Sequence, residues 1–201
     1  MDNSAFFNIG YGLYVLTAKE NEKQNGCIIN AVMQVTNTPN RLALAVNKDN
    51  YTCGMISRTG AFNVSVLDER ASFDIFRHFG FQSGKDVDKF ASFPGAKPAE
   101  NGILYVTEAT NAYFCAEVIS QQDLGTHMLF LADVTEAKVL SDVKTATYTY
   151  YQEHIKPKPE PKAHGWRCKI CGYVYEGEEL PEEVLSPIAS PEGVTISLGT
   201  S

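Results

Sequence analysis

No apolar run in the chain is long enough to cross a membrane. Spanning a bilayer takes about 20 consecutive apolar residues, and no stretch of the 201-residue sequence approaches that length. The chain also begins without a basic stretch followed by an apolar one, so we expect no secretory leader. The sequence therefore predicts a soluble protein with no membrane partner.

Positive charge is scarce as well. The chain has 17 Lys and Arg residues against 24 Asp and Glu residues, a formal net charge of −7, and no basic cluster offsets this excess. A surface that binds nucleic acid needs clustered positive charge, because the phosphate backbone is anionic. We therefore expect no nucleic-acid partner.

A disulfide framework and a dinucleotide fingerprint are also missing. The five cysteines are an odd number at irregular spacings, which favours a reduced, cytoplasmic protein over a secreted one. No G-x-G-x-x-G motif follows a predicted strand, so we expect no dedicated Rossmann domain.

The chain does have the composition of a globular protein, with 44% apolar and 20% charged residues. Runs rich in β-branched or aromatic residues, bounded by turn residues, predict seven strands in the first 154 residues, and so a mainly β domain, most simply a barrel. These runs cover residues 12–18, 27–29, 41–46, 61–66, 103–106, 112–119 and 127–134. Helices are predicted at residues 51–58, 71–78 and 146–154.

A proline-rich segment divides the chain. Residues 155–163 alternate proline with charged side chains, which favours an extended spacer over helix or sheet. We therefore predict a main domain at residues 1–154, a linker at 155–163 and a small C-terminal segment at 164–201.

The C-terminal segment contains half of a metal site. Cys168 and Cys171 are separated by two residues and followed by glycine, a knuckle that turns two thiolates toward one iron or zinc ion. A tetrathiolate site needs four sulfurs, and the segment supplies two.

From Trp166 to about Ala189 this segment resembles a rubredoxin. The resemblance rests on the cysteine spacing and on Gly172, Tyr173, Tyr175, Leu180 and Pro181. A rubredoxin has its second pair of cysteines where this chain has Ser186 and Ala189. Alanine has no donor atom and a serine hydroxyl is a poor iron ligand at neutral pH, so an iron–sulfur centre within one chain is not expected.

Three outcomes remain open for the two cysteines. Cys168 and Cys171 from two chains could build one four-thiolate site across a two-fold axis. They could instead form a disulfide with each other, or belong to a disordered relic.

Four segments of the main domain, in order, resemble the flavin reductase-like family. They are a loop at residues 30–36 after a glycine-led strand; 46–67, in which Tyr51-Thr52 opens a helix; 80–90, similar to S-G-x-D-x-D-K-F; and 125–131, similar to G-D-H-x-x-F with Thr126 in place of Asp. The resemblance implies an FMN-binding split β-barrel and a homodimer. A rubredoxin-like tail on such a domain is the arrangement of the high-molecular-weight rubredoxins and related flavoreductases.

The residues around Thr52 are candidates for the FMN phosphate. Thr52 lies at the start of a predicted helix, where free N–H groups and the positive end of the dipole favour an anion. Asn47, Lys48 and Asn50 could add donors and charge, and the family match includes Tyr51. Alternatively, residues 47–50 are a solvated turn.

The family places the flavin ring against the next set of candidates, Asn30, Ala31, Val32, Met33 and Gln34. Met33 could equally belong to the core, because methionine is more often a gap filler than a cofactor contact. Ala31 and Met33 stand where the family usually has Ser or Thr, which removes two hydroxyl donors.

His127 is the candidate catalytic residue. By resemblance it lies beside the exposed face of the flavin, where nicotinamide stacks, although a lone histidine on an apolar strand is more often a core or interface residue. Ser83 and Lys89 are candidates for the cofactor or nicotinamide pocket, while the surrounding charges could be an ordinary surface patch.

Together these features predict an enzyme that takes hydride from NAD(P)H and passes electrons through FMN to free flavin, a ferric complex or an iron protein. Hydride transfer needs orientation and a tuned ring, so the lack of a catalytic triad is consistent with it. The alternatives are an FMN-binding electron relay with little NAD(P)H turnover and a metal-linked dimer.

Overall fold

The chain forms two compact units, Met1–Lys156 and Pro157–Ser201. The computed structural model describes residues 1–158, 165–167 and 174–176. None of the helices in this described part has the length and apolar character needed to cross a membrane.

The second unit contains two short described strands. Strands β10 (Gly165–Arg167) and β11 (Val174–Glu176) pair antiparallel. The predicted metal ligands Cys168 and Cys171 lie outside the described residues.

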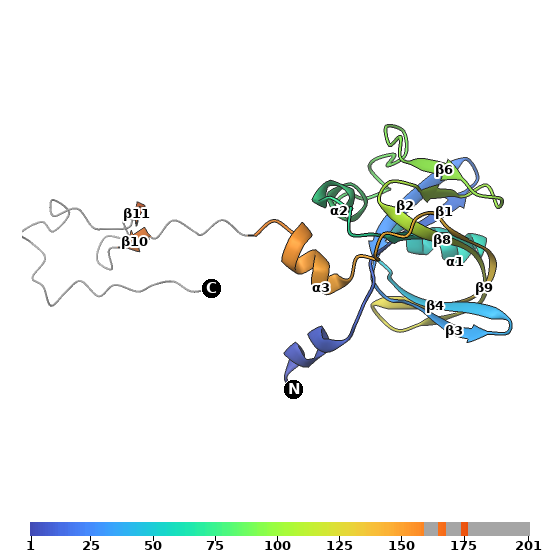
Figure 1. The fold of residues 1–201 in the computed structure, drawn as a ribbon, viewed down its shortest axis with the longest axis horizontal. Helices are drawn as coiled ribbons and strands as arrows, with labels where there is room; N and C mark the ends of the chain where they lie inside the picture. The colour runs from blue at the N-terminus through green and yellow to red at the C-terminus, as the bar shows by residue number, and fades with distance from the viewer. Residues whose placement is uncertain (159–164, 168–173, 177–201) are drawn as a thin grey trace, which may run out of the picture. The chain divides into compact units, whose positions relative to one another are not determined.

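The first unit is built on a seven-stranded antiparallel sheet in the order β2-β1-β5-β8-β9-β4-β3. Its strands are β1 (Tyr14–Glu20), β2 (Lys23–Ile29), β3 (Val32–Asn37), β4 (Asn40–Asn47), β5 (Ala61–Leu67), β8 (Thr110–Asp123) and β9 (His127–Val139). A separate pair joins β6 (Ala96–Pro98) and β7 (Leu104–Val106). β9 pairs with both β8 and β4 and curves between these two parts of the sheet (Figure 1). The mainly β prediction is confirmed.

The helices agree with the sequence in part. Helix α1 (Tyr51–Thr59) ends as predicted at Gly60, whose left-handed backbone (φ 72°) lets its N–H bond to the carbonyl of Ile56. Helix α2 is Phe73–Gly80. The predicted third helix is only Tyr148–Tyr150 (α3), continued as a π-helix over Tyr151–Ile155 (η2).

One predicted element was wrong. The loop expected over residues 30–36 is mostly strand β3, which lies at the sheet edge with one partner and therefore stays exposed along most of its length. The sequence also missed a 3-10 helix at Asn3–Asn8 (η1) and the short strand β6. Short elements give too few residues for a period to show.

The sheet is split between β2 and β3. These two edge strands follow each other in the chain, joined by residues 30 and 31 alone, yet they are not paired with each other. Ala31 instead accepts a hydrogen bond from the backbone N–H of Ala45 on β4 (3.1 Å). The connection therefore crosses the split in the barrel.

The core has two parts, one on each face of β1. Leu16 belongs to a cluster with Met55 of α1 and Phe130 of β9, so α1 fills the inside of the barrel. Val15 faces the other way and packs in a cluster with Phe79 of α2. Successive strand residues point to opposite faces, and a helix covers each face of β1.

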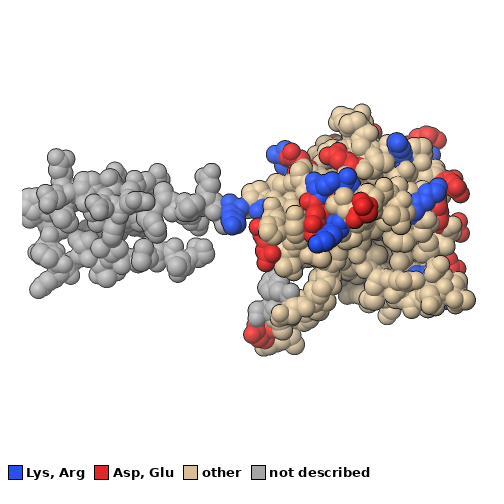
Figure 2. Space-filling model, in the orientation of Figure 1, with Lys and Arg blue, Asp and Glu red and all other residues tan. Residues whose placement is uncertain are grey.

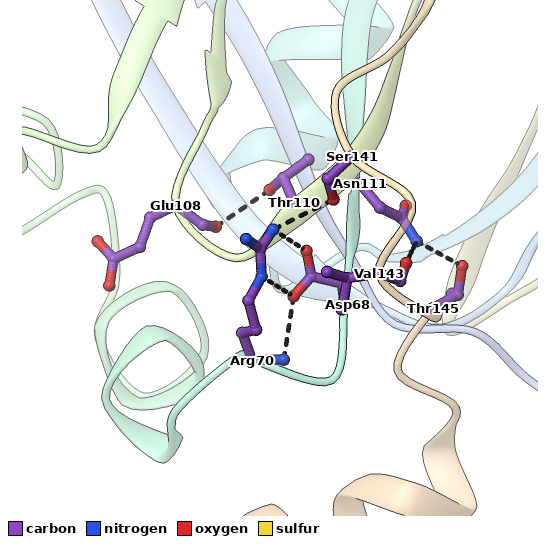
Figure 3. Close-up of polar contacts among 8 residues, drawn as sticks. All are labelled: Asp68, Arg70, Glu108, Thr110, Asn111, Ser141, Val143 and Thr145. Atoms are coloured by element: carbon purple, nitrogen blue, oxygen red, sulfur yellow. Dashed lines mark hydrogen bonds and ion pairs between the residues drawn. The ribbon is translucent and has the colours of Figure 1, made fainter.

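A polar cluster fastens the segment after β9 to the sheet (Figure 3). Buried Asp68 accepts two hydrogen bonds from the guanidinium of Arg70, at 3.0 and 2.6 Å, and Arg70 also reaches the hydroxyl of Ser141. Asn111 donates to the hydroxyl of Thr145 at 2.9 Å. These bonds fix the segment that leads into α3.

A second cluster surrounds Glu136 on β9. Its carboxylate pairs with Lys138 and accepts hydrogen bonds from Tyr113 (2.6 Å) and Cys115 (3.3 Å) on β8. The ammonium of Lys138, followed by the Tyr113 hydroxyl, lowers the pKa of Glu136 to about 2.

Acid is expected to destabilise the fold through Glu136. A glutamate in an unfolded chain has a pKa of about 4.3, so the folded state binds fewer protons, and this stabilisation is present above about pH 4.3 and lost as the pH falls toward 2. In Glu136→Gln the free energy of unfolding should fall less steeply over that interval, as urea titrations at several pH values would measure. Equal slopes for the two proteins would contradict the assignment.

Candidate functional site

Two cavities lie near the C-terminal end of β2, and between them they contain most of the predicted site residues. The first, which we call the polar cavity, has a volume of about 400 Å³. The second, the apolar cavity, has a volume of about 440 Å³. A third hollow of about 430 Å³, beside Arg77 and His78 of α2, contains none of the predicted residues.

The polar cavity brings together segments that are far apart in sequence. It is lined by the predicted residues Asn50, Tyr51, Thr52, Ser83 and Lys89, and also by Asn25, Cys27, Asp49 and Gly84, which were not among the predicted site residues. The start of α1 forms one wall, where the N–H of Cys53 already bonds to the carbonyl of Asn50 (2.9 Å) and the N–H groups of Tyr51 and Thr52 have no partner within the helix. The cavity therefore offers hydrogen-bond donors to an anion.

Thr52 and Asn25 form a buried pair in this cavity. The side-chain amide of Asn25 donates to the hydroxyl of Thr52 at 2.8 Å. Among the described residues, Asn25 Oδ1 is the buried side-chain atom that has no partner. Gly84 lies against this amide so closely that a Cβ at Gly84 would collide with it, so the glycine lets the 81–86 loop close on β2.

Lys89 anchors the 81–86 loop to the neighbouring backbone. Its side chain is buried, and its ammonium donates to the carbonyls of Gly26 (2.8 Å) and Phe79 (2.9 Å). Burial lowers the pKa of Lys89. The ammonium is therefore committed to the protein backbone, which links the loop to β2 and to the last turn of α2.

Cys27 also lines the polar cavity, and its thiol is chemically unreactive. Its side chain is buried, and burial raises the pKa of the thiol to about 11. A thiol that stays protonated at neutral pH is a poor nucleophile. The three cysteines of the first unit, Cys27, Cys53 and Cys115, are all free and buried, so they pack as small apolar side chains.

The apolar cavity lies at the split in the barrel. Four of the predicted residues line it: Asn30, Ala31, Val32 and Met33. The other residues that line it are Ile9, Gly10, Tyr11, Gly12, Tyr14, Ala43, Leu44, Ala45 and Leu129. Gln34 lies outside, on the exposed hairpin, where it bonds to Thr36 and Asn40.

Small side chains form the floor of this cavity. On β4, Leu42, Leu44 and Val46 are buried in the core, so the alternating residues Ala43 and Ala45 face outward. Two alanines in succession on one face leave a flat, shallow surface. A planar apolar group could lie on it.

His127 shares this face. Residues directly opposite in an antiparallel ladder lie on the same side of the sheet, and the pairs Ala45–Leu129 and Asn47–His127 are consecutive on that side. His127 is two residues from Leu129 along β9, and the two therefore lie about 7 Å apart on the same face. Its Nδ1 is 2.9 Å from the hydroxyl of Thr126.

Asn47 and Lys48, two of the residues predicted near the FMN phosphate, lie at the end of β4 and in the turn that follows it, and they have other partners. Asn47 accepts a hydrogen bond from the N–H of Asp49, and Lys48 pairs with Asp123 at 2.7 Å. Neither Asn47 nor Lys48 lines the polar cavity. Asn47 and Lys48 thus lie at a turn outside the polar cavity, while Asn50, Tyr51 and Thr52 line it, and a role of any of them toward the phosphate stays a prediction.

Comparisons with known proteins bear on both units. A family model described as "Flavin reductase like domain" matches residues 6–158. A second model, described as "Rubrerythrin, rubredoxin-like domain", matches residues 166–183 and so includes Cys168 and Cys171 but ends before Ser186.

Two characterised relatives match over most of their length. A high molecular weight rubredoxin of Moorella thermoacetica is 34% identical over 93% of this chain and 89% of its own. A ferric-chelate reductase (NAD(P)H) of Archaeoglobus fulgidus is 36% identical over 79% of this chain and 92% of its own.

A solved structure shows the same fold. The NADH:FAD oxidoreductase SgcE6 of Streptomyces globisporus C-1027 superposes with a TM-score of 0.63, at 22% identity, over 71% of this chain and 84% of that one. The first unit thus has the fold of a flavin reductase.

Proposed function

The chain belongs to the flavin reductase-like family, and on this premise we propose that its two cavities together bind one FMN, which NAD(P)H reduces. The protein is a flavin oxidoreductase with a rubredoxin-like segment. We propose that the flavin is FMN, and the electron acceptor and the roles given below to individual residues are also our proposal.

The observation that carries the proposal is the relation between the cavities. Cys27 lines the polar cavity and Asn30 the apolar one, and three residues of strand span about 10 Å. FMN has a flat, largely apolar ring at one end of a five-carbon chain and a phosphate at the other. The apolar floor and the donor-rich cavity match those two ends.

We assign the phosphate to the polar cavity. Thr52, Ser83 and the first N–H groups of α1 would hold it, and the buried charge of Lys89 adds a favourable field. Asp49 also lines the cavity, so its carboxylate opposes the anion and the donors must outweigh it. The partnerless Asn25 Oδ1 fits a site that is completed by a ligand with hydroxyl groups.

We assign the ring to the apolar cavity. The backbone of residues 30–33 would face the polar edge of the ring, with Ala43 and Ala45 beneath it. When bound, FMN supplies a ring that accepts hydride. The protein orients this ring, excludes water from one face, and leaves His127 beside the position at which nicotinamide would stack.

The visible spectrum of the purified protein tests this function. Flavin absorption that NADH or NADPH bleaches without oxygen would support it, and a colourless protein that takes up no FMN would overturn it. An FMN-loaded protein that either nucleotide reduces only slowly would instead identify an electron relay. Ferric chelates are the first acceptors to assay, because a ferric-chelate reductase is among the relatives.

We also propose that the protein is a cytoplasmic homodimer. Free buried cysteines suit a reducing compartment. Met33 and Val35 of edge strand β3 are 64% and 42% exposed, and the surface over the β3–β4 hairpin, at the lower right of Figure 2, shows little charge. Such an apolar edge suits a partner chain, and sedimentation equilibrium would reveal it.

The rubredoxin-like match supports a metal between two chains. Cys168 and Cys171 supply two thiolates per chain, so one four-thiolate site needs two chains. We expect about one iron or zinc ion per dimer, lost in Cys171→Ser and retained in the control Cys115→Ser. Elemental analysis measures this, and metal-free wild-type protein would exclude the site in favour of a disulfide or an unused relic.

A further inference from the structure

We propose that the hydroxyl of Tyr14 donates a hydrogen bond to the polar edge of the flavin ring and thereby raises the reduction potential of the bound flavin. The inference rests on the proposed function, because it places the ring in the apolar cavity. Tyr14 lies in the glycine-led strand at residues 12–18, but it was not among the site residues predicted from the sequence.

The position of Tyr14 brings it beside the residues proposed to hold the ring. Tyr14 is the first residue of β1 and pairs with Ile29, the last residue of β2. Asn30 follows directly, and both Tyr14 and Asn30 line the apolar cavity. The body of the Tyr14 ring packs against the core cluster inside the barrel, which limits where its hydroxyl can go.

The Tyr14 hydroxyl occupies the space that a side chain at residue 12 would need. A Cβ built on Gly12 would collide with the phenol oxygen of Tyr14. The close approach of backbone and phenol is possible because residue 12 has no side chain. The hydroxyl therefore lies against the backbone of Gly12, which also lines the apolar cavity.

No hydrogen bond within the described part of the chain uses the Tyr14 hydroxyl. The ring is only partly exposed, and the phenol of a tyrosine with a buried body usually finds a partner. Burial also raises the pKa of Tyr14, so the group remains a neutral donor at physiological pH. In a cavity of mainly apolar side chains, this donor adds to the polar groups of Asn30 and the 30–33 backbone that a ring with acceptor atoms would meet.

The chemical consequence follows from charge. Two-electron reduction adds electron density to the ring, so a donor stabilises the reduced ring more than the oxidised one. Removing the donor should weaken binding of both states, and of the reduced state more. By linkage, the ratio of the loss in affinity for reduced flavin to the loss for oxidised flavin sets the change in midpoint potential.

The test is Tyr14→Phe in the full-length, FMN-loaded protein. We expect two- to tenfold weaker binding of oxidised FMN, the effect of one hydrogen bond, and a more negative midpoint potential. Each tenfold difference between the losses for reduced and oxidised FMN corresponds to about 30 mV for a two-electron couple. Binding is measured by quenching of flavin fluorescence and the potential by equilibration with a reference dye.

The matched control is Tyr105→Phe. The ring of Tyr105 stacks on Tyr113 at a centroid distance of 3.9 Å, outside both cavities, so removing its hydroxyl should leave the affinity and the potential unchanged. A second variant, Gly12→Ala, keeps the Tyr14 hydroxyl but displaces it, and should shift the potential in the same direction as Tyr14→Phe.

The outcomes separate this inference from the proposed function. If wild-type protein takes up no FMN, the proposed function fails. If wild-type protein binds FMN and Tyr14→Phe has an unchanged or more positive potential, the proposed function stands and the role of Tyr14 is overturned.

Discussion

Replacing Ala45 with leucine is expected to weaken FMN binding strongly while leaving the domain folded. Ala45 lies on the outer face of β4, forms part of the floor of the apolar cavity and is opposite Leu129. Leucine adds three carbon atoms above a floor that the ring would cover. Overpacking of this size costs about 1–3 kcal/mol in protein cores, which corresponds to about 5- to 150-fold weaker binding.

The control for Ala45→Leu is Ala137→Leu. Ala137 is an exposed strand residue on β9, outside the cavity, so the same enlargement should not change FMN affinity. Fluorescence titration with FMN measures the affinity, and circular dichroism confirms that the variants are folded. If Ala45→Leu binds FMN as tightly as the wild type, the ring does not lie on this floor.

The second large effect is expected on stability, from Lys89→Met. Methionine keeps most of the volume of the side chain but cannot donate to the carbonyls of Gly26 and Phe79. Each buried acceptor left without a partner costs about 1–3 kcal/mol, and the relief from burying an ammonium offsets part of this. We expect a loss of about 2 kcal/mol in the free energy of unfolding.

Lys85→Met is the matched control, because Lys85 is exposed in the same loop. Urea unfolding of the three proteins measures the difference. If Lys89→Met and Lys85→Met have equal stabilities, the ammonium of Lys89 does not hold the loop. The two variants also address a ligand role, since a loss of FMN affinity without a loss of stability would show that Lys89 contacts the phosphate directly.

Strands whose side-chain pattern is decided locally could be predicted from the sequence. β4 and β5 are rich in apolar residues and bounded by turns, and both appear within one residue of their predicted limits. β3 failed because an edge strand has one partner and no buried face to produce alternation. The third helix was overextended because Tyr151–Ile155 adopts π geometry, which periodicity does not distinguish from an α-helix.

The candidate site was predictable only where the residues are consecutive in sequence. Asn50 to Thr52, and Asn30 to Met33, follow each other and line cavities as segments. Asn25 was not predicted because it meets Gly84 only through the fold, 59 residues apart in sequence. Lys48 was included for its charge, and its commitment to Asp123 depends on the return of the β8–β9 hairpin.

The length of the connection across the split fixes which side chains of β3 face the cavity. Residues 30 and 31 are all that separate β2 from β3, and side chains along a strand alternate between faces. An insertion there would reverse which side chains of β3 face the cavity or would shift its pairing with β4. A designer who wishes to accommodate a different ligand would therefore do better to change side chains than to add residues at this point.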